Sequence, residues 1–176
     1  HVRKTVKIGK RLFDSFLFKE KKMAQKKLLL IDGNSVAFRA FYALYRQLDR
    51  FTSPDGLHTN AIFTFKNMLD AIMKQTDPSN VLVAFDAGKV TFRTKMYQDY
   101  KGGRQKTPSE LSEQLPVIRE MLKDLGIKSY ELKNYEADDI IGTLSKMGEE
   151  AGYTVDIVTG DRDLTQLASD KTTVLI

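Results

Sequence analysis

Short apolar runs alternate with helical stretches along most of the chain, and this alternation constrains the fold more than any other feature. The apolar runs at 28–31 and 81–85 are typical of strands that are buried on both faces. Between such runs, apolar side chains recur every three or four residues, which indicates amphipathic helices. Strands that alternate with helices at this spacing predict an α/β fold with a mainly parallel, twisted sheet flanked by helices.

The remaining elements follow the same alternation. Further strands are expected at 127–132, 155–158 and 173–176, and helices at 35–48, 62–72, 107–125, 135–150 and up to 168. The helix at 107 has Thr107 as its expected N-cap and Pro108 at its first position, and Pro116 is expected to kink it. Gly126 is expected to end this helix.

Length and composition narrow the class of protein. The chain has 176 residues, which suits one compact domain, and 41% of them are hydrophobic, too many for a disordered chain. The chain contains no Cys, which excludes disulfides and Cys-ligated metal sites. No apolar run approaches the roughly 18 residues of a membrane span. We therefore expect a monomeric cytoplasmic protein with no membrane partner.

The positive charge is concentrated at the start of the chain. Residues 1–27 hold ten Lys and Arg and two acids, although the net charge of the whole chain is only +5. We expect residues 1–22 to be a basic extension, disordered or foreign to the natural protein, which would start at Met23. A basic arm that contacts phosphates and a targeting segment remain open alternatives. The folded core is expected at 23–176.

Acidic residues gather where the expected strands end. Two follow buried strands directly, two follow a third strand within five residues, and three more open a helix near the same edge. In an open parallel sheet, sites assemble at the carboxyl ends of the strands. The seven candidates for one acidic rim are Asp32, Asp86, Glu136, Asp138, Asp139, Asp161 and Asp163.

Each acid on its own has an ordinary structural interpretation. Asp32 and Asp161 could cap helices, Asp86 could belong to a turn, and the acids at 136–139 could be first-turn residues favoured by the helix dipole. Capping alone would not select carboxylates over Ser, Thr and Asn at every one of these ends. We therefore favour a shared site.

Crowded carboxylates favour a bound cation. Two of them about 4 Å apart repel by roughly 4 kcal/mol at an effective dielectric near 20, so a cluster takes up protons or positive charge. Oxygen ligands suit Mg²⁺ or Mn²⁺ rather than zinc. Helical spacing places Glu136 and Asp139 on one face and turns Asp138 about 100° away, toward a water or a second ion. Two ions about 3.5–4 Å apart would activate a water and stabilise the leaving oxygen of a phosphodiester.

A basic stretch at 87–107 has no helical or strand period and indicates a functional loop or lid. Its basic residues alternate with aromatic ones, a combination that suits binding of an unpaired nucleic-acid strand. An ordinary solvated basic loop remains an open alternative. Arg39 and Arg46, seven apart on the first expected helix, could extend the phosphate track or form an ordinary exposed face. The candidates in the loop are Arg93, Tyr97, Tyr100, Lys101 and Arg104.

Five motifs occur in an order that is found in a known family. They are LIDGNS at 30–35, FD at 85–86, YKGGR at 100–104, EADD at 136–139 and TGDRD at 159–163. With them, residues 23–176 resemble the N-terminal 5′–3′ exonuclease domain of bacterial type I DNA polymerases, within the flap endonuclease family. The resemblance implies a nuclease core of the PIN and resolvase type.

The resemblance also implies roles for residues. The seven carboxylates named above match the family's metal ligands. Lys101 and Arg104 match catalytic basic residues that contact the scissile phosphate and the 5′ strand, whereas Arg93 and Tyr100 match less closely. The implied activity is 5′–3′ exonuclease and 5′-flap endonuclease cleavage of DNA in replication and repair, near the nucleoid, with a polymerase domain in cis.

The chain departs from this family at its C-terminal end. Members continue past the fifth motif into a helical DNA-binding motif and a further Asp pair, and hold two ions. This chain ends at Ile176, so a fragment that holds one ion is also expected. Two alternatives to the nuclease remain open: a non-catalytic module that binds DNA ends, and a toxin-type ribonuclease with a PIN-like fold.

Overall fold

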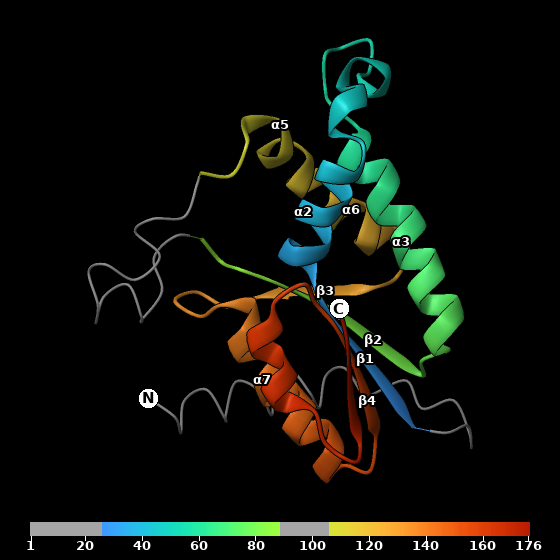
Figure 1. Cartoon of the computed structure of the whole chain (residues 1–176), viewed down its shortest axis with the longest axis vertical. Helices are drawn as coiled ribbons and strands as arrows, with labels where there is room; N and C mark the ends of the chain where they lie inside the picture. The colour runs from blue at the N-terminus through green and yellow to red at the C-terminus, as the bar shows by residue number, and fades with distance from the viewer. Residues whose placement is uncertain (1–25, 89–105) are drawn as a thin grey trace.

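The computed structural model describes residues 26–88 and 106–176 and contains one five-stranded sheet (Figure 1). The strand order is β3-β2-β1-β4-β5, and every neighbouring pair runs parallel. The mainly parallel sheet predicted from the sequence is therefore confirmed. The strands are β1 (Lys27–Asp32), β2 (Asn80–Phe85), β3 (Lys128–Glu131), β4 (Thr154–Val158) and β5 (Thr172–Leu175).

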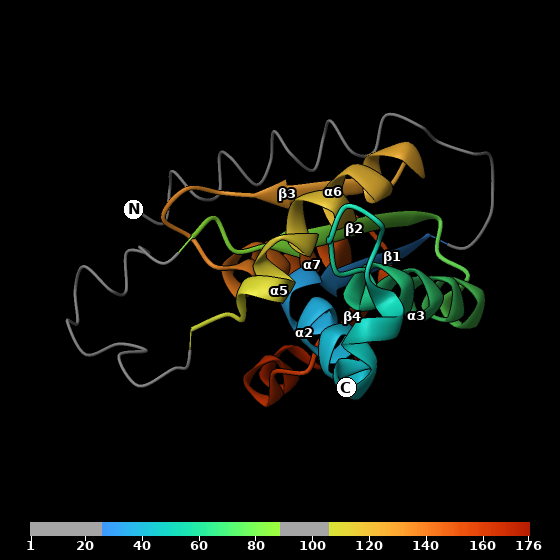
Figure 2. The same ribbon diagram turned by 90° about the horizontal axis from the view of Figure 1, so that it is seen from above.

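Helices cover both faces of the sheet. In Figures 1 and 2, α2, α3 and α6 lie against one face, and α7 lies against the other. Helix α5 is a short turn that leads into α6, and η1 and η2 are 3-10 helices. Their bounds are α2 (Gly33–Ala43), η1 (Tyr45–Phe51), α3 (Asn60–Thr76), α5 (Ser109–Ser112), α6 (Gln114–Asp124), α7 (Ala137–Glu150) and η2 (Arg162–Leu167).

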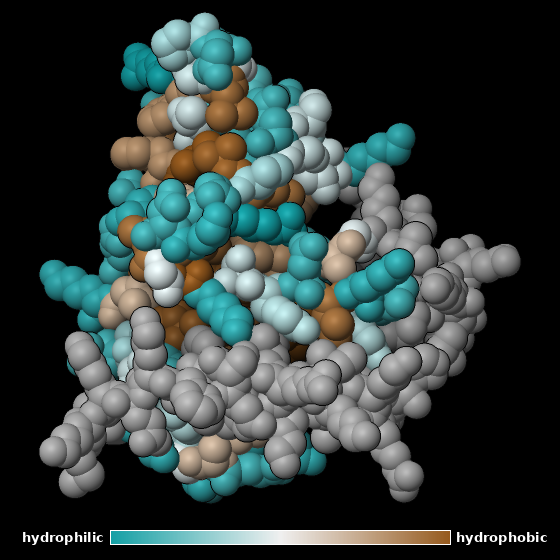
Figure 3. All heavy atoms as spheres, turned by 180° about the vertical axis from the view of Figure 1, so that it is seen from behind, coloured by the Kyte–Doolittle hydropathy of each residue, from teal (hydrophilic) through white to brown (hydrophobic). Residues whose placement is uncertain are grey.

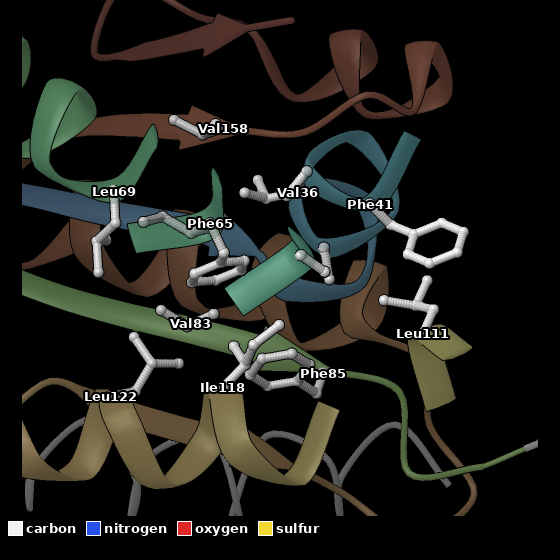
Figure 4. Close-up of a cluster of buried hydrophobic side chains, with 14 of the residues drawn as sticks. Val36, Phe41, Phe65, Leu69, Val83, Phe85, Leu111, Ile118, Leu122 and Val158 are labelled. Atoms are coloured by element: carbon white, nitrogen blue, oxygen red, sulfur yellow. The ribbon is translucent and has the colours of Figure 1, made fainter. Parts of the chain in front are cut away.

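The central strand β1 supplies both hydrophobic cores because successive side chains of a strand point to opposite faces. Leu29 and Ile31 belong to the core beneath α2, α3 and α6. Leu28 and Leu30 belong to the core beneath α7. Figure 4 shows the first of these cores, where aromatic and aliphatic side chains from several elements interlock. The continuous apolar run 28–31 thus reflects a strand buried on both faces.

The strand order reverses beside β1. The chain runs from β1 to β2 and β3 on one side and then returns to place β4 on the other side of β1. The carboxyl ends of β1 and β4 therefore meet at a topological switch point, where open α/β sheets form their ligand crevices. Residues 33–35 follow β1, which ends at Asp32, and residues 159–161 follow β4.

Two helices differ from the sequence-based expectation. The helix expected at 35–48 ends at Ala43 and continues as η1, in which Gln47 has non-helical torsions (φ −123°, ψ 24°). A repeat of three to four residues fits a 3-10 helix as well as an α-helix, so periodicity could not separate them. The helix expected from 135 begins at Ala137.

The helix expected at 107–125 is divided into two. Helix α5 starts at Ser109 with Pro108 as its N-cap, so the expected cap at Thr107 is wrong. The break falls between Ser112 and Gln114, one turn before Pro116. Proline has no N–H to donate to the carbonyl four residues earlier, and its ring clashes with that carbonyl. Gly126 follows the helix with a φ of +70°, as expected of a helix end.

The surface of the described part is mixed in character. Seen from behind (Figure 3), hydrophilic residues alternate with apolar patches. Tyr42, Tyr45 and Phe63 are each about half exposed. No helix within 26–88 and 106–176 has the length and apolar character needed to cross a membrane.

Two glycines of α7 provide a matched test of packing between this helix and the sheet. A Cβ on Gly148 would lie 2.9 Å from Leu28 Cδ2 and 3.2 Å from Val155 Cγ2, whereas a Cβ on Gly142 would lie 3.8 Å from Leu167 Cδ2. Both alanine variants gain about 1 kcal/mol of helix propensity. We expect Gly148→Ala to be less stable than Gly142→Ala by about 1–3 kcal/mol, measured by urea unfolding, because only the former overpacks the core. Equal stabilities would contradict this packing.

Candidate active site

An acidic hollow of about 410 Å³ opens at the carboxyl edge of the sheet. Carboxylates reach it from four places: the end of β1, the end of β2, the start of α7 and the turn after β4. Asn34, Ser35, Phe38, Ala137 and Gly160 complete its lining. Five of the seven acids predicted to share one rim therefore do so, namely Asp32, Asp86, Glu136, Asp138 and Asp161.

Asp32 is the most deeply placed acid at the switch point. Its side chain is buried, and its carboxylate accepts hydrogen bonds from the Ser35 N–H and the Thr159 hydroxyl, both at 3.0 Å. Burial raises the pKa of Asp32, and the charges of Asp86 and Asp161 add to this, while the two hydrogen bonds oppose it. Asp32 caps α2 and lines the hollow at once, so the two interpretations of this residue do not exclude each other.

Asp86 connects the strand end of β2 to two helix starts. One carboxylate oxygen accepts from the Ala137 N–H at 2.7 Å, and the other from Asn34 Nδ2 at 3.2 Å. The Asp86 side chain therefore contacts the first turns of α7 and α2 and does not act simply as a turn residue after β2. The Oδ1 atom of Asn34 is buried and has no hydrogen-bond partner within the described residues. Asn34 itself is one of the residues that line the hollow, so this buried acceptor belongs to a residue of the site.

The start of α7 separates the acids that lie there. Glu136 and Asp139 form a capping box, in which each side chain accepts from the other residue's backbone N–H. Asp138 lines the hollow, and Asp139 is not among its lining residues. Glu136 and Asp139 were expected on one helical face with Asp138 turned away; Asp138 lines the hollow, and the role of Asp139 as a metal ligand stays a prediction. Glu136 precedes the helix in an extended conformation (φ −92°, ψ 161°), so helical spacing does not apply to it.

Asp138 shows the electrostatic cost of the hollow most clearly. Burial, followed by the charges of Asp32, Asp161, Asp86 and Glu136, raises the pKa of Asp138 to about 6. Each of these neighbours lines the same hollow. The site is therefore one in which ionised carboxylates repel each other and a cation would be stabilised.

Asp161 and Asp163 lie in the turn after β4. Asp161 is the N-cap of η2, and its carboxylate accepts from the Asp163 N–H at 2.9 Å, as the capping interpretation predicts. Asp161 also lines the hollow, whereas Asp163 is exposed and is not part of the lining.

The donor set fits a hard divalent cation, although the side chains do not form a finished coordination site. Within residues 26–88 and 106–176, no group of three or more His, Asp and Glu side chains is already arranged to hold a metal ion. The hollow nevertheless presents only oxygen donors from its acids, raised carboxyl pKa values and the unpartnered Asn34 oxygen. Carboxylate, amide and hydroxyl oxygens are the donors that Mg²⁺ and Mn²⁺ prefer.

The predicted nucleic-acid contacts are only partly within the described residues. Arg39 lies exposed on α2, beside a second cavity of about 310 Å³ that α3 and β5 also line. Arg46 is exposed on η1, so the expectation that both arginines share one helix is wrong. The other candidates lie outside the described residues; they are Arg93, Tyr97, Tyr100, Lys101 and Arg104.

Sequence reasoning missed the uncharged polar residues of the site. Asn34, Ser35 and Thr159 all contact the acids of the hollow or the turns that carry them. They lie within the LIDGNS and TGDRD motifs, beside the acids that were predicted to bind metal. The signal available was their position in the turns directly after β1 and β4.

The fold and the hollow together define a parallel α/β domain with an acidic, cation-attracting site at its switch point. The family described as the 5′–3′ exonuclease, N-terminal resolvase-like domain, matches residues 27–176, and the chain belongs to it. The resemblance and the fold expected from the five motifs are thereby confirmed.

Curated relatives agree with this assignment. DNA polymerase I of Lactococcus lactis subsp. cremoris is 63% identical over 154 residues, which cover 86% of this chain and 18% of that protein. DNA polymerase I of Bacillus subtilis is 55% identical over 152 residues, which cover 86% of this chain and 17% of that protein. The chain thus spans less than a fifth of the length of these relatives.

Solved structures share the fold at low sequence identity. A bacteriophage T5 5′-exonuclease with bound divalent metal ions (zinc) has a TM-score of 0.64 at 22% identity, over 85% of this chain and 55% of that one. A T5 flap endonuclease in a pseudo-enzyme-product complex with DNA and metal ions has a TM-score of 0.63 at 21% identity, over 85% and 54% of the two chains. At this identity, the likeness establishes the fold.

The raised pKa of Asp138 gives a testable pH dependence for the metal-free protein. Its carboxyl binds a proton up to about pH 6 when folded, but only up to about pH 4 when unfolded. Ionisation of this group therefore lowers the free energy of unfolding as pH rises between these values. In EDTA, the Tm of Asp138→Asn minus that of the unmodified chain should be small near pH 4 and should grow until about pH 7. A difference that stays constant with pH would contradict the crowding of these charges.

Proposed function

We propose that this domain hydrolyses DNA phosphodiester bonds at 5′ ends and 5′ flaps, using divalent cations held in the acidic hollow. The observation that carries the proposal is the meeting of five carboxylates from four segments at the switch point. Membership of the 5′–3′ exonuclease family supports the same activity.

We propose Mg²⁺ or Mn²⁺ as the cation, with two ions in the complete domain and one as the minimum in this chain. The carboxylates of Asp32, Asp86, Glu136, Asp138 and Asp161 line the hollow and are the nearest candidates for ligands. Asp139 and Asp163 remain predictions from the family motifs; the Asp139 carboxylate accepts from the Glu136 N–H, and neither residue lines the hollow. Bound divalent ions would supply an activated water and stabilise the leaving oxygen.

The rest of the chain would bind and orient the DNA. We propose that Lys101 and Arg104 neutralise charge at the scissile phosphate, and that Tyr97 and Tyr100 stack on an unpaired base. Arg39, Arg46 and Arg93 are proposed to contact backbone phosphates. Exposed Arg39 lies near the turn after β4, since a Cβ on Gly160 would lie 3.4 Å from one of its guanidinium nitrogens. A T5 relative was solved with both DNA and metal ions, which supports a DNA substrate.

The biological setting follows from the relatives and is also a proposal. They are DNA polymerase I proteins of much greater length. We propose that the domain acts with a polymerase region in cis, as a cytoplasmic monomer near the nucleoid, to remove 5′ segments in replication and repair.

Metal binding by the hollow can be tested on the chain directly. One unit charge about 4 Å from a cation is worth up to roughly 4 kcal/mol at an effective dielectric near 20. Asp161→Asn should therefore weaken Mn²⁺ binding about tenfold or more in isothermal titration. Asp124→Asn, at the end of α6 and outside the lining, is the control and should bind as the unmodified chain does. Equal weakening in both variants would argue against the hollow as the site.

Cleavage is tested with a chain that continues past Ile176 as its relatives do. A labelled 5′-flap DNA should be cut in Mg²⁺ or Mn²⁺ and left intact in EDTA, and Asp161→Asn should lower the rate at least about a hundredfold because metal-assisted stabilisation is worth several kcal/mol. Preferential cutting of an RNA substrate would favour the ribonuclease alternative. Flap binding without cutting would favour the DNA-end-binding module.

A further inference from the structure

Thr159 lies between the carboxyl ends of β1 and β4, the two strands that meet at the switch point. It follows β4 directly, its side chain is fully buried, and it lies opposite the end of β1. We infer that Thr159 is a positioning residue whose hydroxyl fixes Asp32 to the turn that carries Asp161, so that both carboxylates keep the spacing that a divalent cation requires. This inference rests on the cation site of the proposed function.

The hydrogen bonds of the Thr159 hydroxyl have only one consistent direction. Its oxygen accepts from the Asp161 N–H at 3.0 Å, and its single proton goes to Asp32 Oδ2 at 3.0 Å. An ionised carboxylate only accepts and a backbone N–H only donates, so the hydroxyl cannot reverse these roles. One side chain thereby connects the carboxylate at the end of β1 to the backbone of the acid after β4.

A second hydroxyl links the same two segments from the opposite direction. The Ser35 N–H donates to Asp32 Oδ1 at 3.0 Å, and Ser35 Oγ accepts from the Gly160 N–H at 2.6 Å. Gly160 allows this approach because a Cβ there would lie 2.7 Å from Ser35 Oγ. We call these contacts of Ser35 and Thr159 the hydroxyl clamp. Both oxygens of Asp32 are thus oriented by the clamp, and the turn at 159–161 is held at two points.

Burial makes the Thr159 contact difficult to replace. Thr159 is 0% exposed, so bulk water cannot take over the bond to Asp32 when the hydroxyl is removed. Valine has nearly the same shape and lacks the hydroxyl, which separates loss of the hydrogen bonds from loss of packing. Groups that orient metal ligands from behind commonly change metal affinity 10- to 100-fold when they are lost.

The test compares Thr159→Val and Thr159→Ser with the unmodified chain. Isothermal titration with Mn²⁺ should show binding about 10- to 100-fold weaker for Thr159→Val, and most of the affinity should return in Thr159→Ser. The electron paramagnetic resonance spectrum of bound Mn²⁺, recorded at saturation, should differ in Thr159→Val and match the unmodified chain in Thr159→Ser. Unfolding of each variant in EDTA gives the stability without metal.

The outcomes separate this inference from the proposed function. If the unmodified chain binds no Mn²⁺, the cation site and the clamp both fail. If it binds Mn²⁺ and Thr159→Val binds equally well, the clamp alone is overturned, even where that variant unfolds at lower temperature. If Thr159→Val does not fold, Ser35→Ala takes its place: weaker Mn²⁺ binding supports the clamp, and unchanged binding overturns it.

Discussion

The structure depends on the parallel pairing of β1 with both β2 and β4. This pairing buries β1 on both faces and brings the carboxyl ends of three strands together. Acids that are distant in the sequence become neighbours because their strands end at one edge: Asp32 is the last residue of β1, Asp86 follows β2, and Asp161 lies in the turn after β4. The hydrophobic cores beneath the helices therefore supply the free energy that holds like charges close together.

That proximity has an electrostatic cost, which the neighbouring groups reduce unequally. Asp32 and Asp86 both accept hydrogen bonds from backbone and side-chain donors. Those to Asp32 oppose the rise in its pKa that burial causes. Asp138 is partly buried among the other acids, and its pKa is the one raised to about 6. The hollow thus disfavours the ionised form of Asp138. A cation in the hollow would stabilise this charge.

Much of the fold could be predicted because each signal was local. The apolar runs located the strands, and acids directly after them located the edge where the site lies. The sequence could not distinguish α2 from the 3-10 helix η1, since both fit the same apolar spacing. It also could not show that helical spacing does not apply to Glu136, a residue that precedes the helix in an extended conformation. Hydrogen bonds between distant segments, such as the one from Thr159 to Asp32, could not be predicted because they leave no local pattern in the sequence.

Capping and cation attraction use the same side chains at this edge. A helix start offers unpaired N–H groups, and a carboxylate that accepts them is oriented while retaining lone pairs for another partner. Asp32 accepts from the Ser35 N–H and still lines the hollow, and Asp161 does the same with the Asp163 N–H. Asp139 accepts from the Glu136 N–H and is not among the lining residues, whereas Glu136, its partner in the capping box, does line the hollow. A capping contact and a place in the lining are therefore compatible in the same carboxylate at this edge.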